Sequence, residues 1–193
     1  MAELFLQISV SLDGFIEDSS GDIEWMTSDT SLDALATRTL QEIDGMIFGR
    51  KAHALLAAFW PTAGESQDAT PDLISQARLM HSLPKYVLTH GQERTGWANS
   101  HAITLDDVPR ITRDAARPIA VFAGAAAAQA ILAHDLIDEI RLIQYPLLLG
   151  GGTRLFADDG VRRPFSLTSA EQFQSGATVQ RYRPASKTYT AGP

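Results

Sequence analysis

Two short segments of this sequence place glycine where a helix is expected to begin. Gly49-Arg50-Lys51 follows the apolar run 46–48, and Gly124-Ala125-Ala126 follows the most apolar run, 119–123. In an open α/β sheet, ligands bind beyond the carboxyl ends of the strands, where helix N-termini offer N–H groups to a phosphate. The Arg50 guanidinium can add two hydrogen bonds to such a phosphate. The segments therefore predict phosphate binding, with ordinary tight turns as the alternative, since neither is a full dinucleotide fingerprint.

Three aspartates, Asp13, Asp29 and Asp33, are the acidic candidates for proton chemistry. A carboxyl group near the carboxyl edge of a sheet can hold a protonated ring nitrogen or relay a proton during a reduction. Each also has an ordinary structural interpretation: Asp13 precedes a glycine as turn formers do, Asp29 can cap a helix, and Asp33 can be a solvated helix residue. Trp25, which stands shortly before that helix, is either a packing residue or the wall of a pocket.

Other common catalytic groups are absent or unsuitably spaced. The chain has no cysteine, which excludes a disulfide scaffold, thiolate metal sites and a cysteine nucleophile. The five histidines show no metal-ligand spacing, and no serine stands in a nucleophile-elbow motif. The hydrolase and metalloenzyme classes are therefore disfavoured, and no metal site is expected.

Apolar periodicity predicts the elements that position these residues. Segments with strand-like patterns alternate with segments in which apolar residues recur at three and four residue steps. The expected strands are 4–12, 46–48, 85–89, one near Ile103, 119–123 and 140–145, followed by an antiparallel hairpin of 165–173 and 178–182. The expected helices run from a cap at Ser28 or Asp29 to about Ile43, from Arg50 to a stop at Trp60-Pro61, over 71–81, near 106–115, and over 124–134. The pattern predicts an α/β fold whose mostly parallel sheet is covered on both faces and ends in the antiparallel hairpin.

Length and charge narrow the class of protein. The 193 residues suit one domain, which we expect over residues 1–184, with 185–193 as a flexible tail. A formal net charge of −7 with scattered lysines and arginines argues against a nucleic-acid partner. The sequence shows neither a signal peptide nor a membrane span, and the lack of cysteine fits the cytoplasm.

Several stretches together resemble one protein family. They occur in the same order along nearly the whole chain: Ser9-Val10-Ser11-Leu12-Asp13-Gly14-Phe15-Ile16, Met46-Ile47-Phe48-Gly49-Arg50-Lys51, Trp60-Pro61, Lys85-Tyr86-Val87-Leu88-Thr89, Leu136-Ile137-Asp138-Glu139, and Pro146-Leu147-Leu148-Leu149-Gly150-Gly151-Gly152 with Arg154-Leu155-Phe156. This set resembles the dihydrofolate-reductase-like proteins related to the reductase half of the riboflavin-pathway deaminase-reductase. The resemblance implies a three-layer α/β/α fold with NADPH lying across the carboxyl ends of the strands.

The resemblance also implies roles for individual residues. Cofactor contacts are implied for Asp13, Gly14 and Ile16 beside the nicotinamide, for Gly49, Arg50 and Lys51 and for Ala123, Gly124, Ala125 and Ala126 at the phosphates, and for Thr89 and His90 at the 2′-phosphate. On the substrate side it implies Trp25 as a wall and Asp29 or Asp33 as the catalytic acid.

Two departures bear on the substrate. Riboflavin-pathway reductases tend to carry a lysine in the first strand and an acidic residue before the glycine that follows the apolar strand, where this chain has Gln7 and Ala123. This argues against a phosphoribosyl substrate. The expected activity is therefore NADPH-dependent reduction of a pteridine, pyrimidine or related heterocycle. The alternative is a nucleotide-binding sensor or sequestering protein without chemistry.

A second copy of the chain is the expected protein partner. The segment 140–149 carries more large apolar residues than one face of a strand needs. Either a helix of the same chain covers them, or they form an association surface. Because twofold dimers are the commonest closed assembly, and because the related proteins tend to form them, we expect a homodimer.

Overall fold

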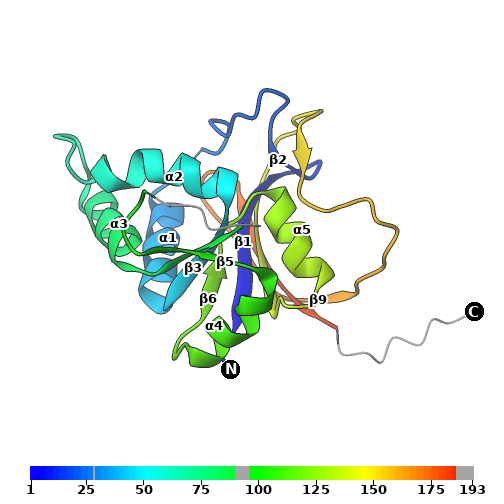
Figure 1. Cartoon of the computed structure of the whole chain (residues 1–193). Coiled ribbons are helices and arrows are strands. Elements are labelled where there is room, and N and C mark those ends of the chain that lie inside the picture. The colour runs from blue at the N-terminus through cyan, green and yellow to red at the C-terminus, as the bar shows by residue number, and fades with distance from the viewer. Residues whose placement is uncertain (28, 90–95, 186–193) are drawn as a thin grey trace, which may run out of the picture.

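The computed structural model describes residues 1–27, 29–89 and 96–185, in which strands and helices largely alternate (Figure 1). The strands are β1 (Leu4–Ser11), β2 (Phe15–Glu17), β3 (Gly45–Gly49), β4 (Lys85–Leu88), β5 (Ser100–Ile103), β6 (Ile119–Val121), β7 (Glu139–Tyr145), β8 (Thr153–Arg154), β9 (Phe165–Gln172) and β10 (Thr178–Pro184). The helices are α1 (Thr30–Glu42), α2 (Arg50–Ala63), α3 (Pro71–Ser82), α4 (Val108–Asp114) and α5 (Ala125–Ala133), with a short 3-10 turn, η1 (Leu105–Asp107).

The described strands form one eight-stranded sheet and a small two-stranded one. The order in the large sheet is β5-β4-β3-β6-β1-β7-β10-β9, and all pairs from β5 to β7 are parallel. The last two pairs, β7 with β10 and β10 with β9, are antiparallel. This arrangement confirms the α/β fold with a mostly parallel sheet and a C-terminal antiparallel hairpin.

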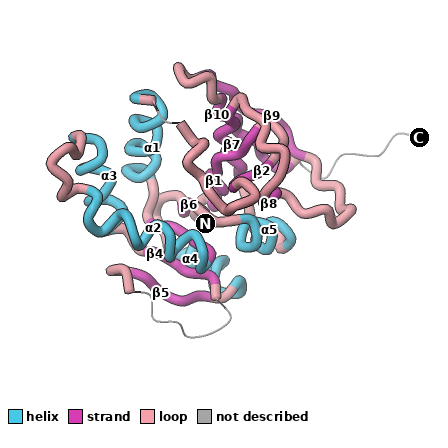
Figure 2. Tube along the Cα trace, turned by 90° about the horizontal axis from the view of Figure 1, so that it is seen from above, coloured by secondary structure: helices cyan, strands magenta, loops and turns pink. Residues whose placement is uncertain are grey.

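Helices cover both faces of this sheet, as the view from above shows (Figure 2). The side chains of β3 alternate between the two layers, because successive residues of a strand point to opposite faces. Met46 and Phe48 pack in the cluster that α1, α2 and α3 complete, whereas Ile47 packs in the cluster of α4 and α5. The centre of the sheet is therefore buried on both faces, and a ligand can reach the sheet only at the ends of its strands.

The covering of β7 answers the question raised by its apolar run. Ile143 and Tyr145 pack against Leu32 and Leu35 of α1 in the third core cluster. A helix of the same chain, α1, therefore covers the face of β7 that carries Ile143 and Tyr145. Leu148 of the same run is 69% exposed and stays outside the core.

The prediction that α2 ends at Trp60-Pro61 is wrong. The helix continues through Pro61 to Ala63. A proline in the last turn removes only one backbone hydrogen bond, and tertiary packing supplies the compensation. Trp60 packs against the core cluster beneath α2, and Ala63 is itself buried, so the final turn is held in place from one side.

The sequence patterns also miss the two-stranded sheet of β2 and β8. Phe15 pairs with Arg154 and Glu17 with Thr153, which brings the segment after β1 onto the segment after β7. In the predicted tail, only Ala185 is described, and residues 186–193 lie outside the described residues. One domain over 1–184 stays a prediction.

Candidate functional site

The two glycine junctions lie side by side at the carboxyl edge of the sheet. Strands β3 and β6 are neighbours, with Ile47 opposite Val121, so the chain leaves both strands at the same level. Gly49 is the N-cap of α2 and Gly124 the N-cap of α5, and neither cap has a side-chain hydrogen bond. The first turns of two helices therefore present backbone N–H groups to the same edge.

The glycines at these caps differ in their surroundings. A Cβ atom on Gly49 would lie 3.0 Å from the Cβ of Ala127, so glycine there allows α5 to approach closely. A Cβ atom on Gly124 would meet nothing within 4 Å. Ala123 and Ala125 are buried, whereas Ala126 is exposed. The open space therefore lies on the outer side of the α5 junction, where a ligand can reach the backbone.

Lys51 is paired within the chain. Its ammonium group donates to both carboxylate oxygens of Glu17, at 2.9 and 2.8 Å, and Glu17 also accepts from the hydroxyl of Thr153 at 2.6 Å. The hydrogen bond from Lys51 is the main cause that lowers the pKa of Glu17. The pair joins the start of α2 to β2, so Lys51 has a partner within the chain and is not positioned solely for a phosphate.

The other residues expected to bind the cofactor phosphates differ in exposure and come from different elements. Arg50 is exposed at the start of α2, and Thr89 is buried directly after β4, the strand beside β3. The prediction for His90 lies outside the described residues. A cavity of about 720 Å³ opens beside Arg50, with Ala54 and Ala57 of α2 and Val87 of β4 in its wall.

Asp13 anchors the glycine cluster 150–152. Its carboxylate accepts hydrogen bonds from the backbone N–H of Leu149 at 3.1 Å and of Gly150 at 2.8 Å. It also accepts from the hydroxyl of Ser11 at 2.7 Å, and this bond is the main cause that lowers the pKa of Asp13 to about 2. Asp13 thus joins the loop after β1 to the loop after β7.

The two residues that follow Asp13 have backbone and core roles. Gly14 has a φ of +89° in the turn before β2, a conformation that glycine adopts without strain. The side chain of Ile16 is buried in the core cluster on the α5 side. Any contact of these two positions with a ligand therefore involves the backbone.

Acid is expected to weaken the Asp13 anchor in a defined pH range. Because the pKa of Asp13 is lowered from 3.8 to about 2, its contribution to stability is present above about pH 4 and is lost as the pH falls through 2. Asp13→Asn removes one acceptor at every pH. The difference in melting temperature between the two proteins should be constant near neutrality and should shrink between pH 4 and 2. A difference that grows in this range would contradict the anchoring role.

Asp29 and Asp33 have different environments although they lie one helical turn apart. The Asp29 carboxylate accepts from the N–H groups of Ser31 and Leu32 at 2.8 and 2.9 Å, and from that of Ser175 at 2.7 Å. These bonds, with Leu32 foremost, lower the pKa of Asp29. Asp29 is therefore a helix cap that also holds the hairpin turn.

Tyr145 is a site residue that sequence reasoning placed on an association surface. Burial raises the pKa of its hydroxyl, which shares a hydrogen bond with the side chain of Ser9, and the charges of Asp29 and Asp33 raise it further. Trp25 packs edge-on against Tyr145, with ring centroids 5.5 Å apart. The sequence signal was the place of Tyr145 at the carboxyl end of an apolar strand.

Ser9, Trp25 and Tyr145 lie together at the carboxyl halves of β1 and β7, and the charges of Asp29 and Asp33 act on Tyr145. The indole N–H of Trp25 is buried and has no hydrogen-bond partner among the described residues. A buried donor of this kind is costly unless it meets an acceptor. The indole N–H groups of Trp60 and Trp97 are buried without a partner in the same way, so the state of Trp25 does not by itself indicate a ligand.

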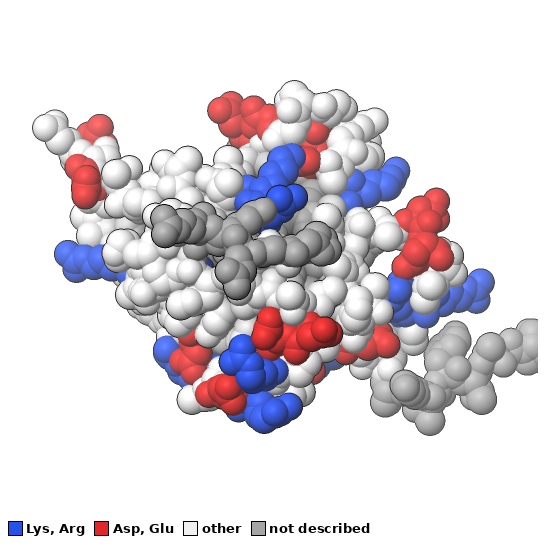
Figure 3. Space-filling model, viewed as in Figure 1, with Lys and Arg blue, Asp and Glu red and all other residues white. Residues whose placement is uncertain are grey.

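The residues that the structure describes contain neither a membrane-spanning helix nor a cluster of metal ligands. None of their helices is long and apolar enough to cross a membrane, and no group of three or more acidic or histidine side chains could hold a metal ion. On the face shown in Figure 3, basic and acidic side chains lie interspersed in small groups.

Comparison with known proteins identifies relatives over almost the whole chain. The model of the RibD C-terminal domain family matches residues 2–179. The uncharacterized protein YyaP of Bacillus subtilis is 30% identical over 178 residues, which cover 90% of each chain.

Solved structures show the same fold at lower identity. A putative riboflavin biosynthesis protein from a Shewanella species has a TM-score of 0.68 at 23% identity and matches 96% of this chain and 100% of its own. The deaminase/5-amino-6-(5-phosphoribosylamino)uracil reductase of Thermotoga maritima has a TM-score of 0.66 at 17% identity over 95% of this chain, which spans 57% of its length. Enterococcus faecalis dihydrofolate reductase, complexed with NADP(H), has a TM-score of 0.63 at 11% identity and matches 95% of this chain and 97% of its own.

Proposed function

The chain belongs to the family of RibD C-terminal domains, a family with a reductase-type fold, and from this premise we propose that it is an NADPH-dependent reductase of a small heterocycle. The observation that carries the proposal is the convergence of the α2 and α5 N-termini, both capped by glycine, at the carboxyl edge of the sheet. Tyr145, packed against Trp25, lies at the carboxyl end of β7 in the same sheet. One edge of the sheet thus offers a phosphate site and a ring site together.

The residues at the junctions fit a dinucleotide. Gly49 and Gly124 leave the backbone accessible, and the N–H groups of the two first turns would bind the pyrophosphate. Arg50 would bind the 2′-phosphate with help from Thr89, and His90 stays a prediction for the same group. The apolar wall beside Arg50 suits the adenine ring. The loop from Asp13 to Ile16 would line the nicotinamide, which supplies the hydride when the cofactor is bound.

The chain's own residues would bind and protonate the substrate. Trp25 and Tyr145, whose rings pack edge to face, would lie against a flat ring of the substrate. Asp33 would hold the proton that the ring nitrogen gains during reduction. Asp29 would keep α1 and the hairpin turn in register. A pteridine or a pyrimidine is a flat ring with a basic nitrogen and fits these roles.

Cofactor binding tests the proposal directly. NADPH at a hundredfold excess over its dissociation constant should stabilise the protein by about 2.7 kcal/mol, or roughly 5 to 10 °C in melting temperature. NADH should give a smaller shift, because it lacks the phosphate that Arg50 would bind. Arg50→Ala should weaken NADPH affinity roughly ten to a hundredfold, since charge-assisted hydrogen bonds are lost, while NADH binding changes little.

Differential scanning fluorimetry and calorimetry measure these effects, with Arg110→Ala, an exposed ion-paired arginine on α4, as the control. Equal shifts with both nucleotides would contradict the role of Arg50. Absence of a shift with either would contradict the proposed function. A shift without turnover of any heterocycle would favour the alternative, a nucleotide-binding sensor on the same fold.

A homodimer in the cytoplasm completes the proposal. Strand β9 is an edge of the large sheet and carries Leu167, which is 56% exposed, so it is the most suitable surface for a second copy. Light scattering should give about 42 kDa, twice the chain mass of 21.0 kDa, and Leu167→Asp should lower it toward the monomer. A wild-type mass near 21 kDa at micromolar concentration would contradict the dimer.

A further inference from the structure

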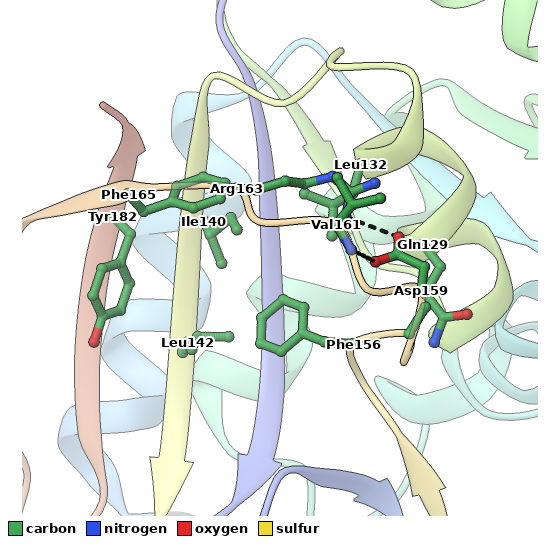
Figure 4. Close-up of a pocket in the computed structure, with 11 residues that line it drawn as sticks. Gln129, Leu132, Ile140, Leu142, Phe156, Asp159, Val161, Arg163, Phe165 and Tyr182 are labelled. Carbon is green, nitrogen blue, oxygen red and sulfur yellow. Dashed lines mark hydrogen bonds and ion pairs between the residues drawn. The ribbon is translucent and has the colours of Figure 1, made fainter. Parts of the chain in front are cut away.

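A cavity on the α5 side of the sheet is separate from the residues proposed to bind cofactor and substrate. It measures about 350 Å³ and lies between α5, β7 and the segment 156–163, with β9 and β10 on one side (Figure 4). Leu132 of α5 and Ile140 and Leu142 of β7 line it with aliphatic side chains. Phe156 faces these strands from the opposite wall.

The outer wall exposes apolar side chains that a folded protein normally covers. Phe156 is 48% exposed and Val161 57% exposed, and both line the cavity. Their exposure next to a ready-made hollow costs free energy in proportion to the apolar area that faces water. A molecule that filled the cavity would remove this area from water. A volume of about 350 Å³ lies at the lower end of the range for small-molecule pockets and is too small for a helix.

The cavity also contains one cation with donors to spare. Arg163 donates to Asp159 at 2.9 Å, and the other oxygen of Asp159 accepts from the N–H of Val161 at 2.9 Å. Both oxygens of Asp159 are thus occupied. A guanidinium carries five N–H donors, and this is the one hydrogen bond of Arg163 found within the described part of the chain. Arg163 can therefore bind a second carboxylate through its other edge.

We propose that this cavity is a second small-molecule site that takes a compact aromatic carboxylic acid. The ring lies between Phe156 and the aliphatic side chains of β7, and the carboxylate accepts from Arg163 at the rim. Apolar burial supplies the affinity, and the guanidinium sets the preference for an acid over a neutral analogue. The site shares no residue with the proposed cofactor and substrate groups, so it does not depend on the proposed function.

Two matched probes and three variants test the proposal. Calorimetry on the full chain without nucleotide compares naphthalene-2-carboxylate with naphthalene-2-carboxamide, which has nearly the same shape and no charge. The acid should bind the wild type about tenfold more tightly than the amide. Arg163→Gln should abolish this difference, whereas Arg162→Gln, the exposed neighbour, should keep it. Ala157→Trp, an exposed position in the cavity wall, should abolish binding of both probes.

Three outcomes would overturn the proposal. Equal affinity of the wild type for the two probes would mean that Arg163 does not bind the carboxylate. If Ala157→Trp binds the two probes with the same affinity as the wild type, the probes bind elsewhere, for example at the proposed cofactor site. A fall from dimer to monomer mass in Ala157→Trp would identify the cavity as a contact between two copies. The NADPH-induced melting shift should persist in Ala157→Trp, so failure of this site is distinguishable from failure of the proposed reductase.

Discussion

Replacing Gly152 by alanine is expected to lower the melting temperature by about 5 to 20 °C. A Cβ atom at this position would lie 2.0 Å from the carbonyl oxygen of Glu17 and 2.9 Å from the carbonyl carbon of Asp18. Both neighbours are backbone atoms, which cannot rotate away as a side chain can. The φ of +128° adds strain for any residue other than glycine. Strain and overpacking together cost about 2 to 5 kcal/mol, and this amount corresponds to the expected shift for a chain of this size.

Gly160→Ala is the matched control for this prediction. Gly160 also has a positive φ, +68°, but a Cβ atom there would meet nothing within 4 Å. Only the strain of the left-handed conformation remains, about 1 kcal/mol. Thermal unfolding of both variants separates the two contributions. If Gly152→Ala unfolds at the same temperature as Gly160→Ala, the glycine cluster does not pack against β2 and the shape assigned to this loop is wrong.

The large sheet was predictable because burial on both faces leaves a strong sequence pattern. The apolar runs of β3 and β6 are short and bounded by glycine or by turn residues, so their strands stand out from the helices. The amphipathic period of α1 likewise marks the helix, and of the two caps that the sequence offered, Ser28 and Asp29, the structure has Asp29. Where packing repeats a regular period, the local sequence is sufficient to locate the element.

The small sheet was not predictable for the opposite reason. Strands β2 and β8 have three and two residues, which is too short for a period to show. Their pairing depends on contacts between distant segments, such as Asp13 with Gly150, 137 positions apart. The helical Pro61 is a similar case, because the packing of Trp60 outweighs a local preference.

The candidate site was predictable at its junctions and less so at its side chains. Gly49 and Gly124 carry their role in the local sequence, since a glycine between a strand and a helix is visible without a structure. The roles of Lys51 and Asp29 depend on hydrogen bonds to distant residues, which the local sequence does not reveal. Lys51 is held by Glu17, and Asp29 by the turn at Ser175, 146 positions away. Tyr145 could be placed beside α1 and Trp25 only with the structure, in which α1 covers β7.

Asp33→Asn is expected to reduce the turnover number at least about a hundredfold while NADPH binding is retained. The substitution keeps the size of the side chain and removes the group that would supply the proton. Proton transfer by a positioned acid contributes typically a hundred to ten thousandfold to a rate. Oxidation of NADPH, followed by its absorbance with dihydrofolate, dihydropterins and aminouracils as substrates, gives the turnover number, and melting shifts give cofactor binding.

Asp29→Asn is the control that separates chemistry from helix capping. Asparagine caps a helix as well as aspartate does, so its amide oxygen keeps the two bonds from Ser31 and Leu32. The amide nitrogen that replaces the second oxygen cannot accept, so only the bond from Ser175 is lost. The melting temperature should fall by a few degrees, roughly what one lost hydrogen bond costs, with turnover nearly unchanged. If Asp29→Asn is inactive and Asp33→Asn is active, the catalytic acid is Asp29 and not Asp33. Full activity of both variants would mean that water supplies the proton and that neither aspartate is a catalytic residue.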